Sequence, residues 1–530
     1  MANLQPLRNY LRQNITHLRS TPCLLITSSP PPAISTAVAG TKNPHSHSSF
    51  NSGDEKQRRE QRDQLKFQQQ QTNPKIHAFV QRNVQSLTQE FNLRSVPIAT
   101  GSAFPTLEGV DEAVSLAKRA GLKGGGGSLG SGGGGEQGVV IGIGSGAAID
   151  LAKAVADTLF GNNINGNGGS GSGGSLVLAP STLGGFWAAS SNSPSLLLDI
   201  KEEMLLPHLT SSWGYDAATA ADASPKRRRG TIVTLDSSRY LAMPPLYSPF
   251  RPMKRSEYSS GLPSMAHVAA AVLSIVLDVA RSVDQEMKAG TTTKDERNVE
   301  LYRHVAEEMK TVASSCALVL QLATQEAKND DSGGTDDPTS NHMMAQQHLL
   351  DVIPRLSPLI EQSSLLGQQR CMMTAGTIPH KMAHALMPAY FPQCHIVTYL
   401  ASILPGLCDA LAARDISSSS NGKVLSMVEN VTNSIINCGE GESDDDNANA
   451  TKSPMLLSSW ASQVAMEAGI PSMASLAFGT PDLNALVGSL DSYETLVASL
   501  NGGGVKSGSG GCGRDDHRIM EDVLQRSLNR

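Results

Sequence analysis

The sequence predicts a doubly wound α/β domain followed by an all-helical domain, on the basis of two observations. In the first half, short apolar runs typical of strands alternate with segments whose apolar residues recur at helical spacing. From about residue 256 onward only the helical spacing remains. We therefore expect the α/β domain over residues 1–255 and the helical domain over residues 256–530.

The expected elements of the first half follow one another as helix and strand. Four strands are predicted by the runs CLLITSS, SVPIATGS, GVVIGIG and SLVLAPST, at residues 23–29, 95–102, 138–144 and 175–182. Helices are predicted at residues 7–18, 77–91, 107–122 and 147–160. Glycine-rich or polar segments, which cannot form a core, separate these elements at residues 40–74, 123–137, 161–174 and 207–229. The alternation is typical of a parallel sheet with helical crossover connections.

The first 53 residues contain no Asp or Glu and include three arginines, a composition that an organelle transit peptide shares. The competing interpretation is that LRNYLRQNITHL and CLLITSS already form a helix and the first strand of the fold. We favour this second interpretation because CLLITS is apolar, β-prone and followed by turn residues. The expected location is then the cytoplasm, with an organelle as the alternative.

Composition excludes several kinds of partner. A formal net charge of −6 argues against general binding to nucleic acid or to a membrane surface, and we interpret the basic run 226–229 as a solvated loop. No apolar run approaches the roughly 20 residues that span a bilayer. The seven cysteines show no CxxC spacing, which favours a reducing compartment over a disulfide framework. We expect a soluble protein that binds a small molecule, and a homodimer is a candidate assembly.

A glycine-rich turn follows the third expected strand. In GVVIGIGSGAAIDLAK, the small residues Gly142, Gly144, Ser145 and Gly146 lead directly into a helix. Such residues let the backbone approach a pyrophosphate, and the positive end of the helix favours an anion. The same residues are also found where a strand and a helix simply pack closely, so the turn alone leaves both interpretations open.

The residues around this turn closely resemble the signature of the iron-containing alcohol dehydrogenase and maleylacetate reductase superfamily. The resemblance extends to APSTLGG, LLLDIKEEMLLP and the histidine-bearing segments of the second half. It implies a dehydroquinate-synthase-like fold with a dinucleotide-binding α/β domain, and NAD or NADP as the cofactor. The residues it assigns to cofactor binding are Gly144, Ser145, Gly146, Ala147, Asp150, Lys153, Ser181, Thr182 and Lys201. Turn capping is the alternative role for Ser181 and Thr182.

Four histidines form the other candidate constellation. His380 and His384 are four residues apart, so on a helix they share one face. His267 belongs to a separate apolar segment, and His395 follows a proline-containing loop. The resemblance assigns His267, His380 and His395 as ligands of a divalent iron or zinc ion, and it places His384 beside the nicotinamide and the substrate.

The sequence departs from the family pattern at these ligands. Pro263, which has no ligand atom, occupies the position of the family's aspartate ligand, and Cys394 occupies the register expected for His395. Maleylacetate reductases also lack that aspartate, and the dipeptide His380-Lys381 resembles that branch. Whether a metal is bound is therefore left open.

The leading hypothesis is reversible hydride transfer between NAD(P)H and a small alcohol or carbonyl compound. His267 and His380 would polarise the carbonyl group, directly or through a metal, and His384 would transfer the proton. One rival is a catalytically degenerate relative with a binding or structural role. Another is an enzyme similar to glycerol dehydrogenase or dehydroquinate synthase. We also expect NADPH to be tolerated, because Ser28 and Ser29 stand where NAD-selective relatives often have an acid.

Overall fold

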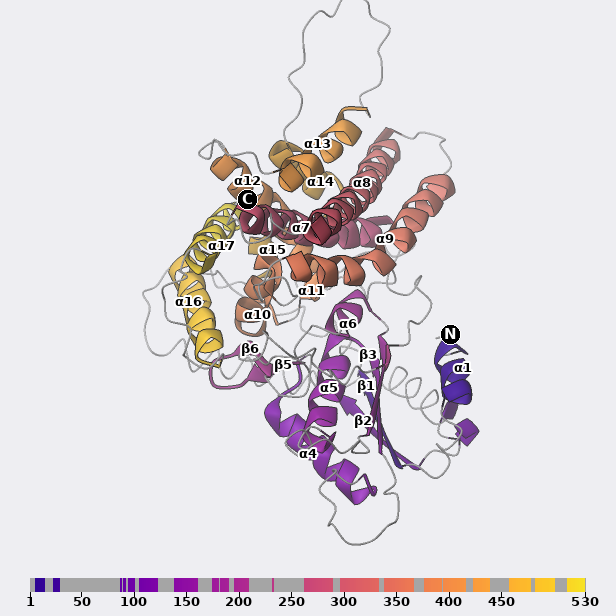
Figure 1. Ribbon diagram of the computed structural model, residues 1–530. Coiled ribbons are helices and arrows are strands. Elements are labelled where there is room, and N and C mark those ends of the chain that lie inside the picture. The colour runs from indigo at the N-terminus through magenta and orange to yellow at the C-terminus, as the bar shows by residue number, and fades with distance from the viewer. Residues whose placement is uncertain are drawn as a thin grey trace, which may run out of the picture.

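The protein folds into an α/β part followed by a helical part, as Figure 1 shows, which agrees with the expected fold class. The structure is a computed structural model. It describes residues 5–14, 22–28, 86–87, 89–91, 94–100, 104–122, 138–160, 174–180, 182–189, 195–208, 231–232, 262–288, 296–332, 338–366, 376–392, 394–415, 423–438, 457–477, 482–500 and 512–529. The change from strands to helices falls between residues 232 and 262.

A parallel five-stranded sheet forms the centre of the α/β part. Its strands lie in the order β2-β1-β3-β4-β7. Their bounds are Pro22–Ser28 for β1, Arg94–Thr100 for β2, Val139–Gly144 for β3, Ser175–Pro180 for β4 and Thr231–Ile232 for β7. The four strands expected from the sequence are confirmed. Because β2 lies on one side of β1 and the later strands lie on the other, the strand order reverses between β1 and β3.

Helices cover both faces of this sheet. Leu24 and Ile26 of β1 pack with α4 (Leu107–Arg119) and α5 (Gly146–Phe160). The alternate residues Cys23 and Leu25 pack with Leu7 and Leu11 of α1 (Gln5–Asn14) on the opposite face. This alternation explains the continuous apolar run of β1, since a strand buried on both faces has no polar side. The helix and strand expected near the N-terminus are confirmed.

A short antiparallel hairpin that the sequence did not predict follows α6. Its strands are β5 (Ser195–Asp199) and β6 (Met204–His208), and Asp199 accepts hydrogen bonds from two backbone amides in the connecting turn. The backbone of Leu198 also bonds to the carbonyl group of Pro105, just before α4, at 2.7 Å. The hairpin therefore stays attached to the α/β part.

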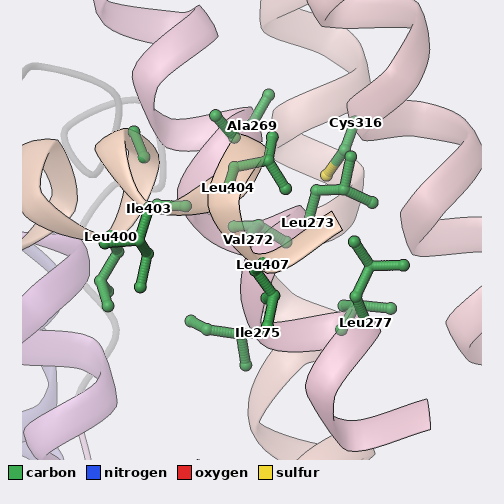
Figure 2. Packing of buried hydrophobic residues seen from close by; sticks show 14 of the residues in the cluster. Ala269, Val272, Leu273, Ile275, Leu277, Cys316, Leu400, Ile403, Leu404 and Leu407 are labelled. Atoms are coloured by element: carbon green, nitrogen blue, oxygen red, sulfur yellow. The ribbon is translucent and has the colours of Figure 1, made fainter. Parts of the chain in front are cut away.

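The second half of the described chain is helical. Its helices are α7 (Leu262–Lys288), α8 (Glu296–Ser332), α9 (Pro338–Leu366), α10 (Ile378–Tyr390), α11 (Ile396–Ser402), α12 (Leu404–Asp415), α13 (Lys423–Cys438), α14 (Leu457–Glu467), α15 (Met473–Leu476), α16 (Leu483–Leu500) and α17 (Cys512–Leu528). Figure 2 shows side chains of α7 packed against those of α11 and α12, with Cys316 of α8 nearby. Helix α7 is the central helix of this core.

The apolar length of α7 shows that one expectation was wrong, namely that no apolar run approaches the length that spans a bilayer. The stretch Met265–Gln285 has 21 residues and is long and apolar enough to cross a membrane, and so is Ile396–Ala413. Both pass this test by length and composition only, and 94% and 78% of their windows are buried inside the protein. A helix surrounded by other helices is apolar on all sides, so the central position of α7 accounts for its composition.

Most of the four polar or glycine-rich segments expected between elements lies outside the described residues. The helix expected at residues 77–91 is described only at its end, where residues 86–87 and 89–91 are helical. Residues 207 and 208, which we assigned to an insert, instead form the end of β6. The apolar neighbours Leu205 and Leu206 extend the strand to these residues.

Candidate active site

The glycine turn connects β3 to α5. Gly144, the last residue of β3, has a φ angle of 144°, a conformation that residues with a Cβ rarely adopt. The first bond of the helix runs from the amide of Ile149 to the carbonyl of Ser145, at 3.1 Å. A Cβ atom on Gly142 would lie 2.6 Å from the Cβ of Ala152, so the absence of a side chain lets α5 approach the strand. Ser145, Gly146 and Ala147 are partly exposed at the start of α5.

A second turn packs directly against the first. It opens the short helix α6 (Leu183–Ala188), whose N-cap Thr182 accepts the amide hydrogen of Gly185 at 3.1 Å. A Cβ atom on Gly185 would lie 2.6 Å from the carbonyl oxygen of Gly144. The two segments assigned to the cofactor by resemblance are therefore in backbone contact. Thr182 does act as a cap, while Ser181 lies outside the described residues.

Helix α6 also contacts the helical part. A Cβ atom on Gly184 would lie 3.1 Å from a methyl group of Ile396 in α11. Figure 1 accordingly shows α6 at the end of the sheet that faces α10 and α11. The turn after β3 and the helices that bear the histidines are thus separated by a single short helix.

Asp150 and Lys153 form a buried pair that connects α5 to α6. The Nζ atom of Lys153 donates to the carbonyl oxygen of Ala188 at 2.7 Å and lies 3.5 Å from Asp150 Oδ1. Burial raises the pKa of Asp150 to about 7, although the neighbouring lysine acts in the opposite direction, and burial lowers the pKa of Lys153. These contacts give the pair a structural role, and its part in cofactor binding stays a prediction.

Lys201 lies in the turn of the β5–β6 hairpin. Its side chain is 90% exposed, and its Nζ atom is 3.6 Å from Glu202. Such a contact between exposed groups holds a lysine weakly. The described contacts of Lys201 do not connect it to the glycine turn, and its part in cofactor binding stays a prediction.

The two histidines of α10 lie one turn apart and are both buried, as their spacing predicted. Their ring centroids are 5.9 Å apart. The hydroxyl group of Thr377 is 2.8 Å from Nδ1 of His380, and the hydroxyl group of Tyr493 in α16 is 3.3 Å from Nδ1 of His384. Each histidine is therefore held at Nδ1 by a hydroxyl group.

Trp187 of α6 extends this pair into a row of rings. Its ring centroid lies 5.2 Å from that of His380, with the two rings nearly perpendicular. At the other end, the ring of Tyr493 lies 6.3 Å from that of His384. The row Trp187–His380–His384–Tyr493 runs from α6 through α10 to α16, so it connects the short helix beside the glycine turn to the C-terminal helices.

Burial keeps both histidines of the row neutral at pH 7. It lowers the pKa of His384 to about 3. It also lowers the pKa of His380 well below the usual value, and the nearby His384 adds to this effect. A neutral imidazole has one N–H donor and one acceptor nitrogen, which suits it to polarise a carbonyl oxygen without introducing a charge.

The three histidines that the resemblance implies as metal ligands do not assemble into a site. His267 is buried in α7. His395 is the N-cap of α11, where its Nδ1 accepts the amide hydrogen of Val397 at 3.3 Å, and burial lowers its pKa to about 4. Within the described segments, no group of three or more His, Cys, Asp or Glu side chains is arranged to hold a metal ion. The side chain of Pro263 lies outside what the structure describes.

A network of buried charges holds α10 in place. Asp278 of α7 accepts the amide hydrogen of Ile378 at 2.8 Å and pairs with Arg281. Asp516 of α17 bonds both Arg281 and Lys381, at 2.9 Å and 3.0 Å. These contacts connect α7, α10 and α17 at the base of the histidine pair.

Sequence reasoning did not identify Thr377, Tyr493 or Asp278. Thr377 lies three residues before His380, and a Thr directly before a helix is a recognisable cap. Tyr493 and Asp278 lie 109 and 100 residues from the groups that they contact. No local spacing in the sequence could have indicated those two pairings.

In comparisons of sequence, no protein-family model and no curated protein matches the chain. In structure, it is similar to the iron-containing alcohol dehydrogenase from Thermococcus thioreducens, with 13% identity, 98% of this chain and 95% of that chain covered, and a TM-score of 0.45. It is also similar to an alcohol dehydrogenase from Oenococcus oeni, with 11% identity, 98% of this chain and 96% of that chain covered, and a TM-score of 0.43. A third similar structure is a probable glycerol dehydrogenase from Sinorhizobium meliloti 1021, with 12% identity, 100% of this chain and 95% of that chain covered, and a TM-score of 0.41.

Proposed function

We propose that the protein is an NAD(P)-dependent oxidoreductase that interconverts a small alcohol and its carbonyl compound. One observation supports this most directly. The glycine turn after β3 is in backbone contact with α6, and Trp187 of the same short helix contacts His380. The segment to which we assign the nucleotide and the pair of neutral histidines therefore both contact α6, a helix of six residues. Hydride transfer needs the cofactor and the polarised carbonyl group to be held close together, and this arrangement supports that.

The sheet topology supports a nucleotide at the glycine turn. Open α/β sheets bind ligands at the carboxyl ends of their strands, at the point where the strand order reverses. Here the order reverses between β1 and β3, whose carboxyl ends are Ser28 and Gly144. The amides of the first turn of α5 point out of this end of the helix, where they favour a phosphate. Gly144, Ser145, Gly146 and Ala147 would hold the pyrophosphate, and the positive φ angle of Gly144 fits such a turn.

The chemistry divides between the cofactor and the histidines. When bound, the nicotinamide supplies or accepts a hydride at the substrate carbon. His380, whose Nε2 has no hydrogen-bond partner among the described residues, donates a hydrogen bond to the substrate oxygen. His384 lies one turn further along α10 and would relay the proton: as Nε2 gives its proton to this oxygen, Nδ1 takes the hydroxyl proton of Tyr493, and both transfers reverse when the alcohol is oxidised. Burial of both rings strengthens these bonds, because water does not compete for them.

The donor set of the described residues does not fit a resident divalent metal, and no step is derived through one. His395 uses Nδ1 to cap α11, and Pro263 brings no ligand atom to its position. His267 is buried, and its part in polarising the carbonyl stays a prediction from the resemblance.

A catalytically degenerate relative is the second candidate, and Trp187 favours it. The indole ring is buried and lies against His380, on the side where a substrate would approach from the cofactor. A ring that only fills this space would exclude a substrate, whereas a ring that lines the space would orient one. Replacing Trp187 with Ala distinguishes the two, because it abolishes activity if the ring orients the substrate and creates activity if the ring blocks it.

Titration of the purified full chain with NADH and NADPH, followed by a panel of small aldehydes, ketones and their alcohols, tests the proposed function. We expect saturable binding of at least one cofactor and oxidation of NAD(P)H with some carbonyl compound. Cofactor binding without turnover would leave only the nucleotide part of the proposal. Absence of binding would overturn it in favour of the degenerate relative.

A further inference from the structure

Helix α10 begins with an exchange of hydrogen-bond partners. Its N-cap is Thr377, yet the hydroxyl group of this residue makes no capping bond. Asp278 of α7 instead accepts the first amide hydrogen of the helix, from Ile378, at 2.8 Å. The hydroxyl group of Thr377 lies 2.8 Å from Nδ1 of His380, and both residues are 3% exposed. The buried carboxylate of Asp278 thus caps the helix in place of the hydroxyl group of Thr377, and this hydroxyl group contacts His380 instead.

The second histidine has an equivalent partner from another helix. Tyr493 of α16 is 5% exposed, and its hydroxyl group lies 3.3 Å from Nδ1 of His384. Burial raises the pKa of this phenol, so Tyr493 retains its proton at neutral pH. A protonated phenol can donate that hydrogen to a ring nitrogen.

We propose that Thr377 and Tyr493 are positioning residues whose hydroxyl groups donate to Nδ1 of His380 and His384, so that each neutral ring carries its proton at Nε2. The proposal rests on the proposed function only for its catalytic consequence. A neutral imidazole has a single N–H, so a ring that accepts at Nδ1 must donate at Nε2. Both histidines then present an N–H group, which is the form that binds a carbonyl oxygen.

The Nε2 atom of His380 is the ring atom that remains for a ligand. It is buried and has no hydrogen-bond partner among the residues that the structure describes, whereas Nδ1 of the same ring is held by Thr377. An orphaned buried donor is costly unless a ligand satisfies it. The pairing therefore identifies the ligand chemistry of this position as a hydrogen-bond acceptor, and a neutral carbonyl or hydroxyl oxygen fits an environment in which both rings are uncharged.

The side chains allow closely matched variants. Thr377→Val removes the hydroxyl group and keeps the branched shape, and Thr377→Ser keeps the hydroxyl group. Tyr493→Phe removes a single oxygen atom. Tyr390→Phe is its control, because the hydroxyl group of Tyr390 joins the same two helices by bonding Ser489 at 3.3 Å and Ala485 at 3.4 Å rather than a histidine.

Nitrogen NMR of the full chain labelled with ¹⁵N-histidine reads the tautomers without any need for activity. His380→Gln and His384→Gln assign the signals. We expect both rings in the Nε2–H form, a shift of His380 alone toward a mixture in Thr377→Val, and a shift of His384 alone in Tyr493→Phe. Thr377→Ser and Tyr390→Phe should leave both rings unchanged. An Nδ1–H form in the unmodified protein, or no change in either hydroxyl-deleting variant, would overturn the proposal.

Kinetics then separates this proposal from the proposed function. If the protein turns over a carbonyl substrate, Thr377→Val and Tyr493→Phe should each lower kcat by roughly tenfold or more, because a ring in the wrong tautomer cannot donate. The KM for the cofactor should stay unchanged. Tautomers that respond as expected in a protein without oxidoreductase activity would retain the positioning roles and reject only the proposed function. An unchanged kcat in both variants would show that the tautomers of the two histidines do not affect catalysis.

Discussion

Asp278 on α7 accepts the backbone hydrogen of Ile378, the first residue of α10, at 2.8 Å. The same carboxylate pairs with Arg281, which is also buried. This relationship fixes the start of the helix that bears His380 and His384 against the central helix of the core. The position of the histidine pair therefore depends on a buried charge that is 100 residues away in the sequence.

Asp278→Ala should strongly destabilise the protein. The variant leaves an amide of α10 without its cap and removes one of the two carboxylates that balance Arg281, and breaking a buried pair costs about 3–5 kcal/mol. Urea denaturation measures the loss in free energy of unfolding. Glu308→Ala is the control, since its ion pair with Arg355 lies at the surface and contributes below about 1 kcal/mol. Losses of equal size in the two variants would contradict the structural role of Asp278.

Acid should destabilise the protein in a way that depends on His384. Its pKa is about 3 in the folded chain because of burial, whereas an unfolded histidine titrates near 6.5. Below pH 6.5 the unfolded state therefore binds a proton that the folded state does not. The free energy of unfolding falls as the pH is lowered from 6.5 toward 3, by up to about 1.4 kcal/mol per pH unit for this residue.

His384→Gln should make this dependence shallower by about one proton over the same pH range. Thermal or urea denaturation at several pH values between 4 and 7 gives the slope, which is informative even if the variant is less stable at pH 7. An identical slope in the variant and in the unmodified protein would mean that His384 is already accessible to protons in the folded state.

We predict that the protein contains little tightly bound metal and that any reductase activity survives chelation. The position of the family's carboxylate ligand is Pro263, and Nδ1 of His395 caps α11. Elemental analysis of protein purified without chelator, with activity assayed before and after dialysis against chelator, measures both quantities. Near-stoichiometric iron or zinc, with turnover that is lost on chelation and restored by the metal, would return His267, His380 and His395 to the role of ligands.

The cofactor preference should depend on Ser28. This residue is the last of β1, at the point where the strand order reverses, and an acid there would repel the 2′-phosphate of NADPH. We expect the unmodified protein to bind NADPH, and Ser28→Asp to weaken NADPH binding by roughly tenfold relative to NADH. Fluorescence titration with both cofactors gives the ratio. A strong preference of the unmodified protein for NADH would contradict this prediction.

Local patterns in the sequence predicted most of the α/β part. The runs at β1, β3 and β4 are apolar and bounded by small or polar residues, and α4 and α5 have apolar residues at helical spacing. The hairpin β5–β6 was not predicted, because each of its strands contains only three consecutive apolar residues, fewer than the runs at β1 and β4. Its pairing depends on contacts between two runs rather than on a pattern within one.

The candidate site was only partly predictable for the same reason. The four-residue spacing of His380 and His384 placed both on one face of a helix, since the helical period is local. The partners that orient or anchor them, Tyr493 and Asp278, come from other helices and contact them only in the folded chain. Asp150 and Lys153 are three residues apart on one helix, but the bond from Lys153 to the carbonyl group of Ala188 joins residues 35 apart, which the sequence pattern could not place together.

Binding of NADPH to Gly146→Ala tests the nucleotide site at the glycine turn most directly. A Cβ atom on Gly146 would lie 3.4 Å from its nearest neighbour, the carbonyl oxygen of Gly184, so the fold should accept the methyl group, and Gly488→Ala, with nothing within 4 Å, is the matched control. We predict that Gly146→Ala keeps its Tm but weakens NADPH binding by roughly tenfold or more, because the methyl group keeps the pyrophosphate from the turn. Gly488→Ala should bind as the unmodified protein does. Unchanged affinity in a well-folded Gly146→Ala variant, or no saturable binding of NADPH or NADH to the unmodified protein, would contradict a cofactor site at this turn.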